Sequence, residues 1–154
     1  MNQDSVVVSQ SKLSETIYVA DFFYTSCPSI CPTMAQQLLK VHDKWKNDTR
    51  FKIVSFSLDP DYDTPSRLKE YAFNLGIDTK QWMFLNGKKD LVYQLAEGYF
   101  TAAVEDKKVP GGILHSGKLI LIDKEGHIRG FYDGTEDYGI EKLLDDIPVL
   151  LQDN

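Results

Sequence analysis

Cysteine is scarce in this sequence, and it contains neither long apolar runs nor basic clusters. Two cysteines, Cys27 and Cys31, are too few for a disulfide framework, so they indicate a site rather than a scaffold. The net charge of −6, with no basic block, argues against a nucleic-acid partner. No apolar run approaches the roughly 18–20 residues of a membrane span, and the N-terminus lacks a signal-peptide pattern.

The apolar residues that are present suffice for one domain over residues 1–154, because 42% of the chain is hydrophobic. Apolar periodicity predicts alternating strands and helices. The predicted strands are one ending near Tyr24, then Arg50–Leu58, Gln81–Leu85, and a hairpin of Ile113–Ile122 and His127–Tyr132. The predicted helices are Pro32–Asn47, Pro65–Leu75, Lys88–Tyr99 and Gly139–Leu151, the last interrupted near Pro148, and Thr101–Gly112 is predicted as a loop.

This order of elements predicts an α/β fold. A β-α-β unit should form a parallel crossover, and the later hairpin and C-terminal helix complete the thioredoxin arrangement. We therefore expect a thioredoxin-like fold, with a central mixed β-sheet flanked by helices and with an inserted strand and helix.

The stretch YVADFFYTSCPSICPTM, residues 18–34, predicts a buried strand that leads through a cysteine-bearing turn into the first helix. Because Pro32 suits the first helical position, Cys31 is expected at or next to the N-cap, with Cys27 on the loop around the helix end. The positive end of the helix favours thiolate, the form that binds soft metals or attacks disulfides.

The cysteine pair has three interpretations: structural cysteines, a redox dithiol or a soft-metal site. Thioredoxin-like oxidoreductases carry two residues between their thiols, whereas three separate Cys27 from Cys31. Two thiolates and one imidazole suit Cu(I) in trigonal geometry, and Cu(II) with a weaker oxygen or water ligand added. A metal-free thiol–disulfide oxidoreductase, with both cysteines catalytic, is the alternative. A thiol peroxidase is more distant, because it needs only one activated cysteine.

Three histidines could supply the imidazole. His42 is expected on the surface of the first helix, and His127 is expected to be exposed because it follows the turn glycine Gly126. His115 lies in PGGILHSG, where a glycine-rich loop enters the first strand of the hairpin. In a thioredoxin-like sheet this point faces the N-terminus of the first helix, so His115 is the candidate third ligand.

An acidic segment follows the second predicted strand. Asp59, Asp61 and Asp63 superficially fit a calcium-loop spacing, but Thr64 stands where such a loop needs glycine. Asp63 and Thr64 are expected to cap the next helix. Asp59 ends the central strand at the same sheet edge as the cysteines. It is expected either next to the metal ligands without binding the metal, or as a plain loop carboxylate.

Three motifs resemble one family. FFYTSCPSICPTM closely resembles the F-x-x-T-x-C-P-x-x-C-P signature of the SCO/SenC copper chaperones. SLDPDYDTPSRLKEYA resembles their S-[IV]-D-P-x-x-D-T motif, and LHSGKLILIDKEGHI resembles their H-[ST] segment with its D-x-x-G turn. The motifs occur in the family's order and cover most of the chain from Tyr18 to Tyr132.

The resemblance implies a thioredoxin-like fold that binds copper through Cys27, Cys31 and His115. It also implies delivery of copper to the dinuclear centre of cytochrome c oxidase subunit II, in exchange with other copper chaperones, or reduction of that subunit's cysteines. Such proteins are membrane-tethered and extracytoplasmic, in the periplasm or the mitochondrial intermembrane space. The family usually has a further strand or hairpin before the cysteine strand, so we expect a truncated start that also removes the anchor.

We expect a monomer that works by ligand exchange rather than turnover. Three ligands leave the copper open to an incoming thiol or imidazole of the partner.

Overall fold

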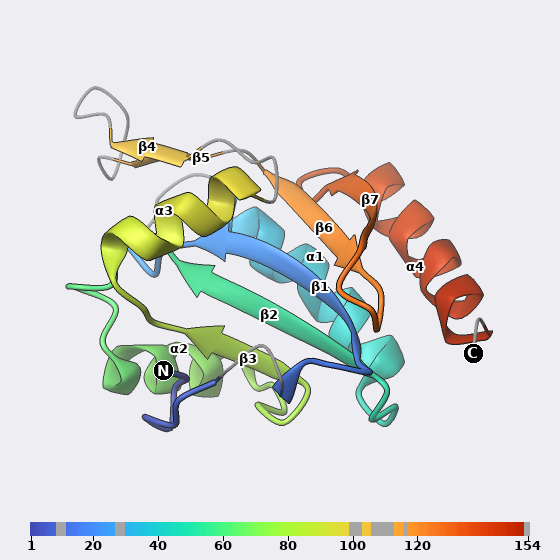
Figure 1. Ribbon diagram of the computed structural model, residues 1–154, viewed down its shortest axis with the longest axis horizontal. Coiled ribbons are helices and arrows are strands. Elements are labelled where there is room, and N and C mark those ends of the chain that lie inside the picture. The colour runs from blue at the N-terminus through green and yellow to red at the C-terminus, as the bar shows by residue number, and fades with distance from the viewer. Residues whose placement is uncertain (9–11, 27–29, 99–102, 106–112, 116, 153–154) are drawn as a thin grey trace.

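The computed structural model describes residues 1–8, 12–26, 30–98, 103–105, 113–115 and 117–152. Its elements follow the predicted alternation of strands and helices (Figure 1). The strands are β1 (Ile17–Phe23), β2 (Phe51–Ser57), β3 (Trp82–Leu85), β4 (Ala103–Glu105), β5 (Ile113–His115), β6 (Lys118–Ile122) and β7 (Ile128–Asp133). The helices are α1 (Ile30–Trp45), α2 (Pro65–Leu75), α3 (Lys89–Gly98) and α4 (Asp137–Gln152).

A five-stranded mixed sheet of order β3-β2-β1-β6-β7 forms the centre of the molecule. β1, β2 and β3 are parallel, whereas β6 runs antiparallel to both β1 and β7. The predicted parallel crossover and C-terminal hairpin are therefore confirmed. We call the edge at which β1 and β2 end the carboxyl edge. Because β6 is antiparallel to β1, it begins at this same edge.

Helices cover both faces of the sheet. In Figure 1, α1 lies behind the sheet and α3 in front of it. On α2, the ring of Tyr71 lies 5.5 Å from the rings of both Phe23 and Phe84, so α2 covers the part of the sheet near β3. Within the described part of the chain, no helix is both long and apolar enough to cross a membrane.

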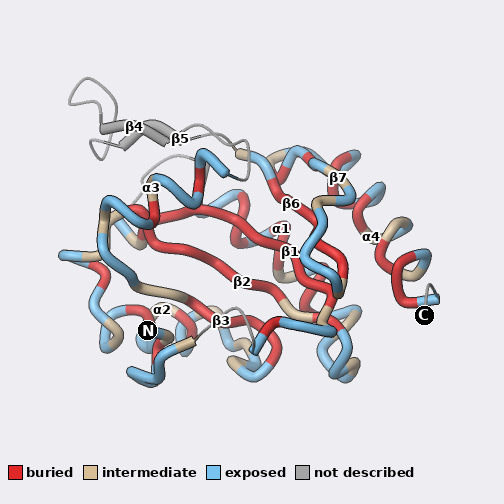
Figure 2. The backbone as a smooth tube through the Cα atoms, viewed as in Figure 1, coloured by how far each residue is buried: buried red, intermediate tan, exposed pale blue. Residues whose placement is uncertain are grey.

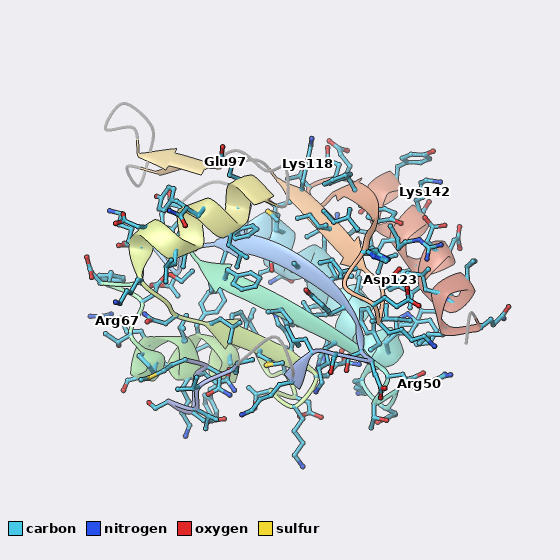
Figure 3. The ribbon with its side chains drawn as sticks, viewed as in Figure 1. Arg50, Arg67, Glu97, Lys118, Asp123 and Lys142 are labelled. Atoms are coloured by element: carbon cyan, nitrogen blue, oxygen red, sulfur yellow. The ribbon has the colours of Figure 1, made fainter. Side chains whose placement is uncertain are left out.

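The central strands carry most of the core. All seven residues of β1 are buried, and Figure 2 shows the buried colour along nearly the whole of β1 and β2. Charged side chains such as Arg67, Lys118 and Lys142 are exposed and lie towards the outside of the molecule (Figure 3). The nearly continuous apolar runs that predicted these strands are explained by the burial of both faces of the sheet.

The first helix begins earlier than predicted. α1 starts at Ile30 rather than Pro32, so Cys31 lies within its first turn. Pro32 is tolerated there because the N–H groups of the first turn have no carbonyl partner within the helix.

The final helix corrects a second prediction. α4 runs without interruption from Asp137 to Gln152, with Pro148 inside it. Burial of Ile147 and Leu150 on either side of the proline holds the helix against the core, which offsets the one hydrogen bond that Pro148 cannot donate.

The region between α3 and β6 also differs from the prediction. Part of the predicted loop Thr101–Gly112 forms β4, which pairs with β5 in a separate two-stranded sheet. The predicted strand Ile113–Ile122 is therefore two strands, β5 and β6, and only β6 belongs to the main sheet. Strands of three residues are too short to give a periodic signal in the sequence.

One carboxyl group is buried in the middle of the sheet. Asp21 on β1 is 3% exposed, and Ser55 on the adjacent β2 donates a hydrogen bond to it. Ser55 in turn accepts a hydrogen bond of 2.9 Å from the indole Nε1 of Trp82. Burial raises the pKa of Asp21 from 3.8 to about 7, against the opposing effect of the bond from Ser55. Asp21 is therefore an acid that the folded protein keeps protonated in weakly acidic solution.

Asp21 makes folding stability depend on pH. Between pH 4 and pH 7 the unfolded chain releases this proton and the folded protein keeps it, so the contribution of Asp21 to stability falls as pH rises and levels off above pH 7. We expect Asp21→Asn to remove this fall. The stability of the variant relative to the parent should rise by up to about 4 kcal/mol between pH 4 and pH 8.

Urea unfolding at both pH values measures this difference. Asp145→Asn, at an exposed position on α4, is the control and should not show it. A difference between the D21N variant and the parent that stays constant with pH would contradict the prediction.

Candidate metal centre

The structure places Cys31 at the N-terminal end of α1, at the carboxyl edge. Cys31 is 3% exposed and belongs to the main hydrophobic core, with Met34 one turn further along the helix. Its backbone lies among the first-turn N–H groups, whose partial positive charge favours a thiolate. The expected position at or next to the N-cap is therefore close to the observed one. Cys27, the other predicted thiolate ligand, lies outside the described residues.

His115 is the last residue of β5, where it pairs with Ala103 of β4. β6 begins three residues later, at Lys118. The backbone oxygen of Gly117 accepts a hydrogen bond of 2.7 Å from the N–H of Gly134, which fixes the chain just before β6. After His115 the chain thus enters the main sheet at the carboxyl edge. β1 ends at this same edge, just before the cysteine turn.

The prediction for His42 was wrong. His42 is 3% exposed, and its Nε2 accepts a hydrogen bond of 3.1 Å from the N–H of Asp78. Its ring centroid lies 6.2 Å from that of Trp82. The sequence misleads here because a histidine next to the apolar stripe of a helix can equally face solvent or pack beneath a distant loop, here the one between α2 and β3. These contacts give His42 a structural role.

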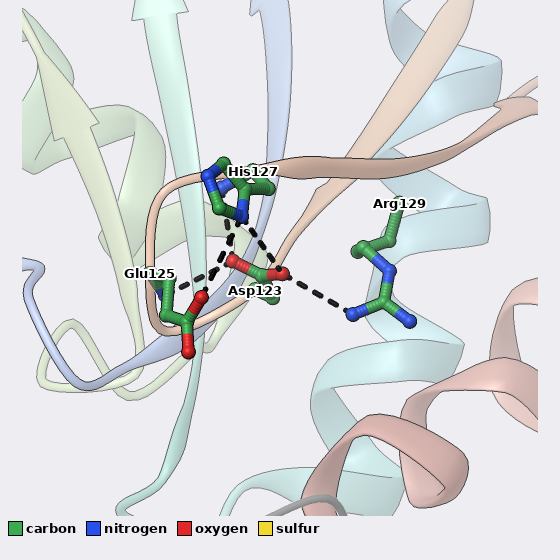
Figure 4. A network of polar contacts seen from close by, with 4 residues as sticks. All are labelled: Asp123, Glu125, His127 and Arg129. Atoms are coloured by element: carbon green, nitrogen blue, oxygen red, sulfur yellow. Dashed lines mark hydrogen bonds and ion pairs between the residues drawn. The ribbon is translucent and has the colours of Figure 1, made fainter.

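The prediction that His127 is exposed is confirmed, because 71% of its side chain is accessible. It belongs to a polar cluster at the β6–β7 turn, shown in Figure 4. Asp123 accepts hydrogen bonds of 2.9 Å from the N–H groups of Glu125 and His127, and one of 3.2 Å from Arg129. Since β6 ends at this turn, the cluster lies at the edge of the sheet opposite the carboxyl edge.

Asp59 follows β2 by two residues and is half-buried. Its pKa is raised above the ordinary value, first because burial removes water and next because the negative charge of Asp63 lies nearby. Lys89 lowers the pKa of Asp59 and Asp61 raises it further. Asp59 therefore lies at the carboxyl edge, as expected from its place after the strand, and burial together with neighbouring negative charge makes it harder to ionise.

Asp63 has a role that the sequence did not reveal. It was expected to cap α2 together with Thr64. Thr64 does so, because its side-chain oxygen accepts a hydrogen bond from the N–H of Arg67. Asp63 instead turns inward: it is 0% exposed, and its carboxylate binds Thr25 and Ser57. An aspartate before an N-cap threonine gives the same sequence pattern for either role, so only the fold distinguishes them.

The described residues contain no cluster of three histidine, cysteine, aspartate or glutamate side chains suited to a metal. The predicted ligand set draws on Cys27, outside the described residues, and on His115, for which only the backbone course is described. The joint ligand set Cys27, Cys31 and His115 therefore stays a prediction, while the topology brings the segments on either side of these residues to one edge.

Known proteins of similar sequence cover nearly the whole chain. A SCO1 protein homologue of Bacillus subtilis is 30% identical over 148 residues, which span 95% of this chain and 77% of that protein. A putative copper-binding protein of Stutzerimonas stutzeri is 27% identical over 84% of this chain and 64% of its own length.

Solved structures match the fold. A SCO1/SenC family lipoprotein of Bacillus anthracis superposes with a TM-score of 0.89 at 27% identity, covering 98% of this chain and 90% of that one. BsSco, described as a member of the Sco family of cytochrome c oxidase assembly proteins with a disulfide switch, gives 0.83 at 29% identity, covering 96% and 87%. The thioredoxin-like fold is thus confirmed. The SCO1/SenC family model matches residues 1–152, and this chain belongs to that family.

Proposed function

We propose that this chain is a copper-binding chaperone that holds one copper ion through Cys27, Cys31 and His115. The observation that carries the proposal is the shared carboxyl edge. β1 ends at this edge and the chain continues into the cysteine turn. α1 begins at the same edge with Cys31 in its first turn, and the chain after His115 enters β6 there. Two segments far apart in sequence, the cysteine turn with the start of α1 and the chain that leads into β6, would thereby supply two thiolates and one imidazole at one edge of the sheet.

The chemistry of this donor set favours copper. Thiolates are soft ligands that select Cu(I), and a trigonal set with one imidazole leaves a position for an incoming ligand. The first turn of α1 favours the thiolate of Cys31, and the surrounding core limits access of water. Cu(II) would take a further, weaker oxygen or water ligand.

The names of the relatives support a biological setting for this chain. One is named a putative copper-binding protein, one structure is of a lipoprotein, and another is of a cytochrome c oxidase assembly protein. We propose that the chain, acting as one domain and a monomer, receives copper from other chaperones. It would deliver the ion to the dinuclear centre of cytochrome c oxidase subunit II, on the extracytoplasmic side of a membrane to which it is tethered.

Anaerobic titration of the fully reduced protein with Cu(I), against a competing chelator, tests the ligand set. We expect one tightly held copper per chain. His115→Ala should weaken the affinity by more than about 100-fold, since removal of a direct ligand exceeds the effect of altering an outer hydrogen bond. Cys27→Ser and Cys31→Ser should do the same. His127→Ala is the matched control and should bind like the parent protein.

The titration also separates copper delivery from the thiol–disulfide alternative. A metal-free reductase would use Cys27 and Cys31 without His115. If copper bound weakly and without regard to His115, while the dithiol still reduced a partner disulfide, the chaperone proposal would be wrong.

We further propose that Asp59 lies beside the copper ligands without binding the metal. Its half-buried place after β2 and its raised pKa support this position. Because the charge of Lys89 lowers the pKa of Asp59, Lys89→Met should raise that pKa further, and Asp61→Asn should lower it.

Carboxyl ¹³C NMR titration of Asp59 in the copper-free protein measures both shifts. Lys88→Met, at the adjacent lysine, is the control and should leave the titration of Asp59 unchanged. An unchanged Asp59 titration in the K89M variant would show that the charges of this edge do not act on it as described.

A further inference from the structure

The carboxylate of Asp63 accepts three hydrogen bonds, more than a helix cap requires. One carboxylate oxygen accepts a hydrogen bond of 3.0 Å from the backbone N–H of Thr25 and another of 2.7 Å from the hydroxyl of Ser57. The other carboxylate oxygen accepts a hydrogen bond from the hydroxyl of Thr25. The side chain is wholly enclosed, so its charge is balanced by these three donors rather than by water.

These bonds hold the chain where it leaves the sheet. β1 ends at Phe23, whose oxygen accepts a last ladder-like bond of 2.7 Å from the N–H of Leu58. Two residues further on, the N–H of Thr25 is bonded to Asp63 instead of to a strand. Thr25 is in turn two residues before Cys27. Asp63 therefore holds the last described turn before the cysteine pair.

The loop that carries Asp63 is itself braced from the other side. The side-chain amide of Asn86, just after β3, donates bonds of 2.8 Å to the oxygen of Pro60 and 2.7 Å to the backbone oxygen of Asp63. Within the same loop, the N–H of Asp63 donates to the oxygen of Asp59 at 2.8 Å. The carboxylate thus projects from a fixed loop, and it can transmit that rigidity to Thr25.

We propose that Asp63 is a positioning residue for the cysteine site. It acts through Thr25 and does not touch the metal: it sets the direction in which the chain leaves β1 and hence the place of Cys27 relative to Cys31 on α1. This inference rests on the proposed function for its copper readout, but the placement of the thiols can be tested without copper. Removal of the acceptor would leave the N–H of Thr25 without its partner and release the turn.

Two substitutions at Asp63 separate hydrogen bonding from charge. Asp63→Ala removes every acceptor, and we expect the Cu(I) affinity to fall about tenfold or more, as for loss of one buried bond to a charged group. Asp63→Asn keeps a carbonyl oxygen for the N–H of Thr25 and the hydroxyl of Ser57, and its amide NH2 can donate to the hydroxyl of Thr25, which rotates to accept. Its affinity should stay within about threefold of the parent protein, well short of the tenfold loss.

Asp123→Ala is the matched control for lost stability. Asp123 is also buried and its carboxylate also has three donors, here two backbone N–H groups and one side chain, but it lies at the opposite edge of the sheet. Thermal unfolding should show that both alanine variants are destabilised. Only the D63A variant should lose copper affinity.

The pH dependence of alkylation of the reduced thiols, measured without copper, supplies the second readout. The apparent thiol pKa should change in the D63A variant and stay unchanged in the D63N and D123A variants.

If the parent protein bound no copper but this pattern held, the proposed function would fail and the role of Asp63 would stand. The role of Asp63 would be overturned if the D63A variant kept normal thiol titration, or if the D63N and D63A variants were equally impaired, which would assign the effect to charge alone.

Discussion

The structure depends on the position of β1 at the centre of the sheet. β1 is paired with β2 on one side and β6 on the other, and every one of its residues is buried. A strand enclosed in this way cannot shift its register without exposing apolar side chains and breaking two ladders. The points at which it enters and leaves the sheet are therefore fixed, and the segment with the two proposed cysteine ligands follows its carboxyl end. Rigidity of the site begins in the core rather than in the loops.

Where a central strand ends, its backbone N–H groups need new hydrogen-bond acceptors, and here a carboxylate supplies one. Where β1 and β2 end, backbone N–H groups lose their ladder partners while still partly enclosed. Asp63 supplies the acceptor there, with three donors around its carboxylate. Asp21, in the middle of the same strand, has one bond from a serine hydroxyl, and its pKa rises to about 7. The same residue type thus braces the chain in one place, whereas in the other its contribution to stability falls as pH rises from 4 to 7.

Sequence alone predicted the main architecture because its signals are local and strong. Apolar runs marked β1 and β2, and the Thr64–Pro65 pair and Gly76 marked the ends of α2, where Gly76 adopts a left-handed φ of 70°. It failed where the deciding contact is distant in sequence. His42 is buried by the chain around Asp78, and Asp63 turns inward to Thr25, 38 residues away. β4 and β5 stabilise each other as a pair, so neither three-residue strand shows a periodicity of its own.

Under the proposed function, the three ligands are anchored by separate means. Cys31 is held by α1 in the core, Cys27 follows the turn fixed by Asp63, and His115 precedes the chain fixed by Gly117 and Gly134. Because each anchor holds a different part of the chain, loss of one metal–ligand bond need not release the other two ligands. A partner could then replace one ligand at a time, which keeps each step of the exchange small in free energy. Separate anchoring at a rigid sheet edge is thus compatible with both tight holding and stepwise release of the metal.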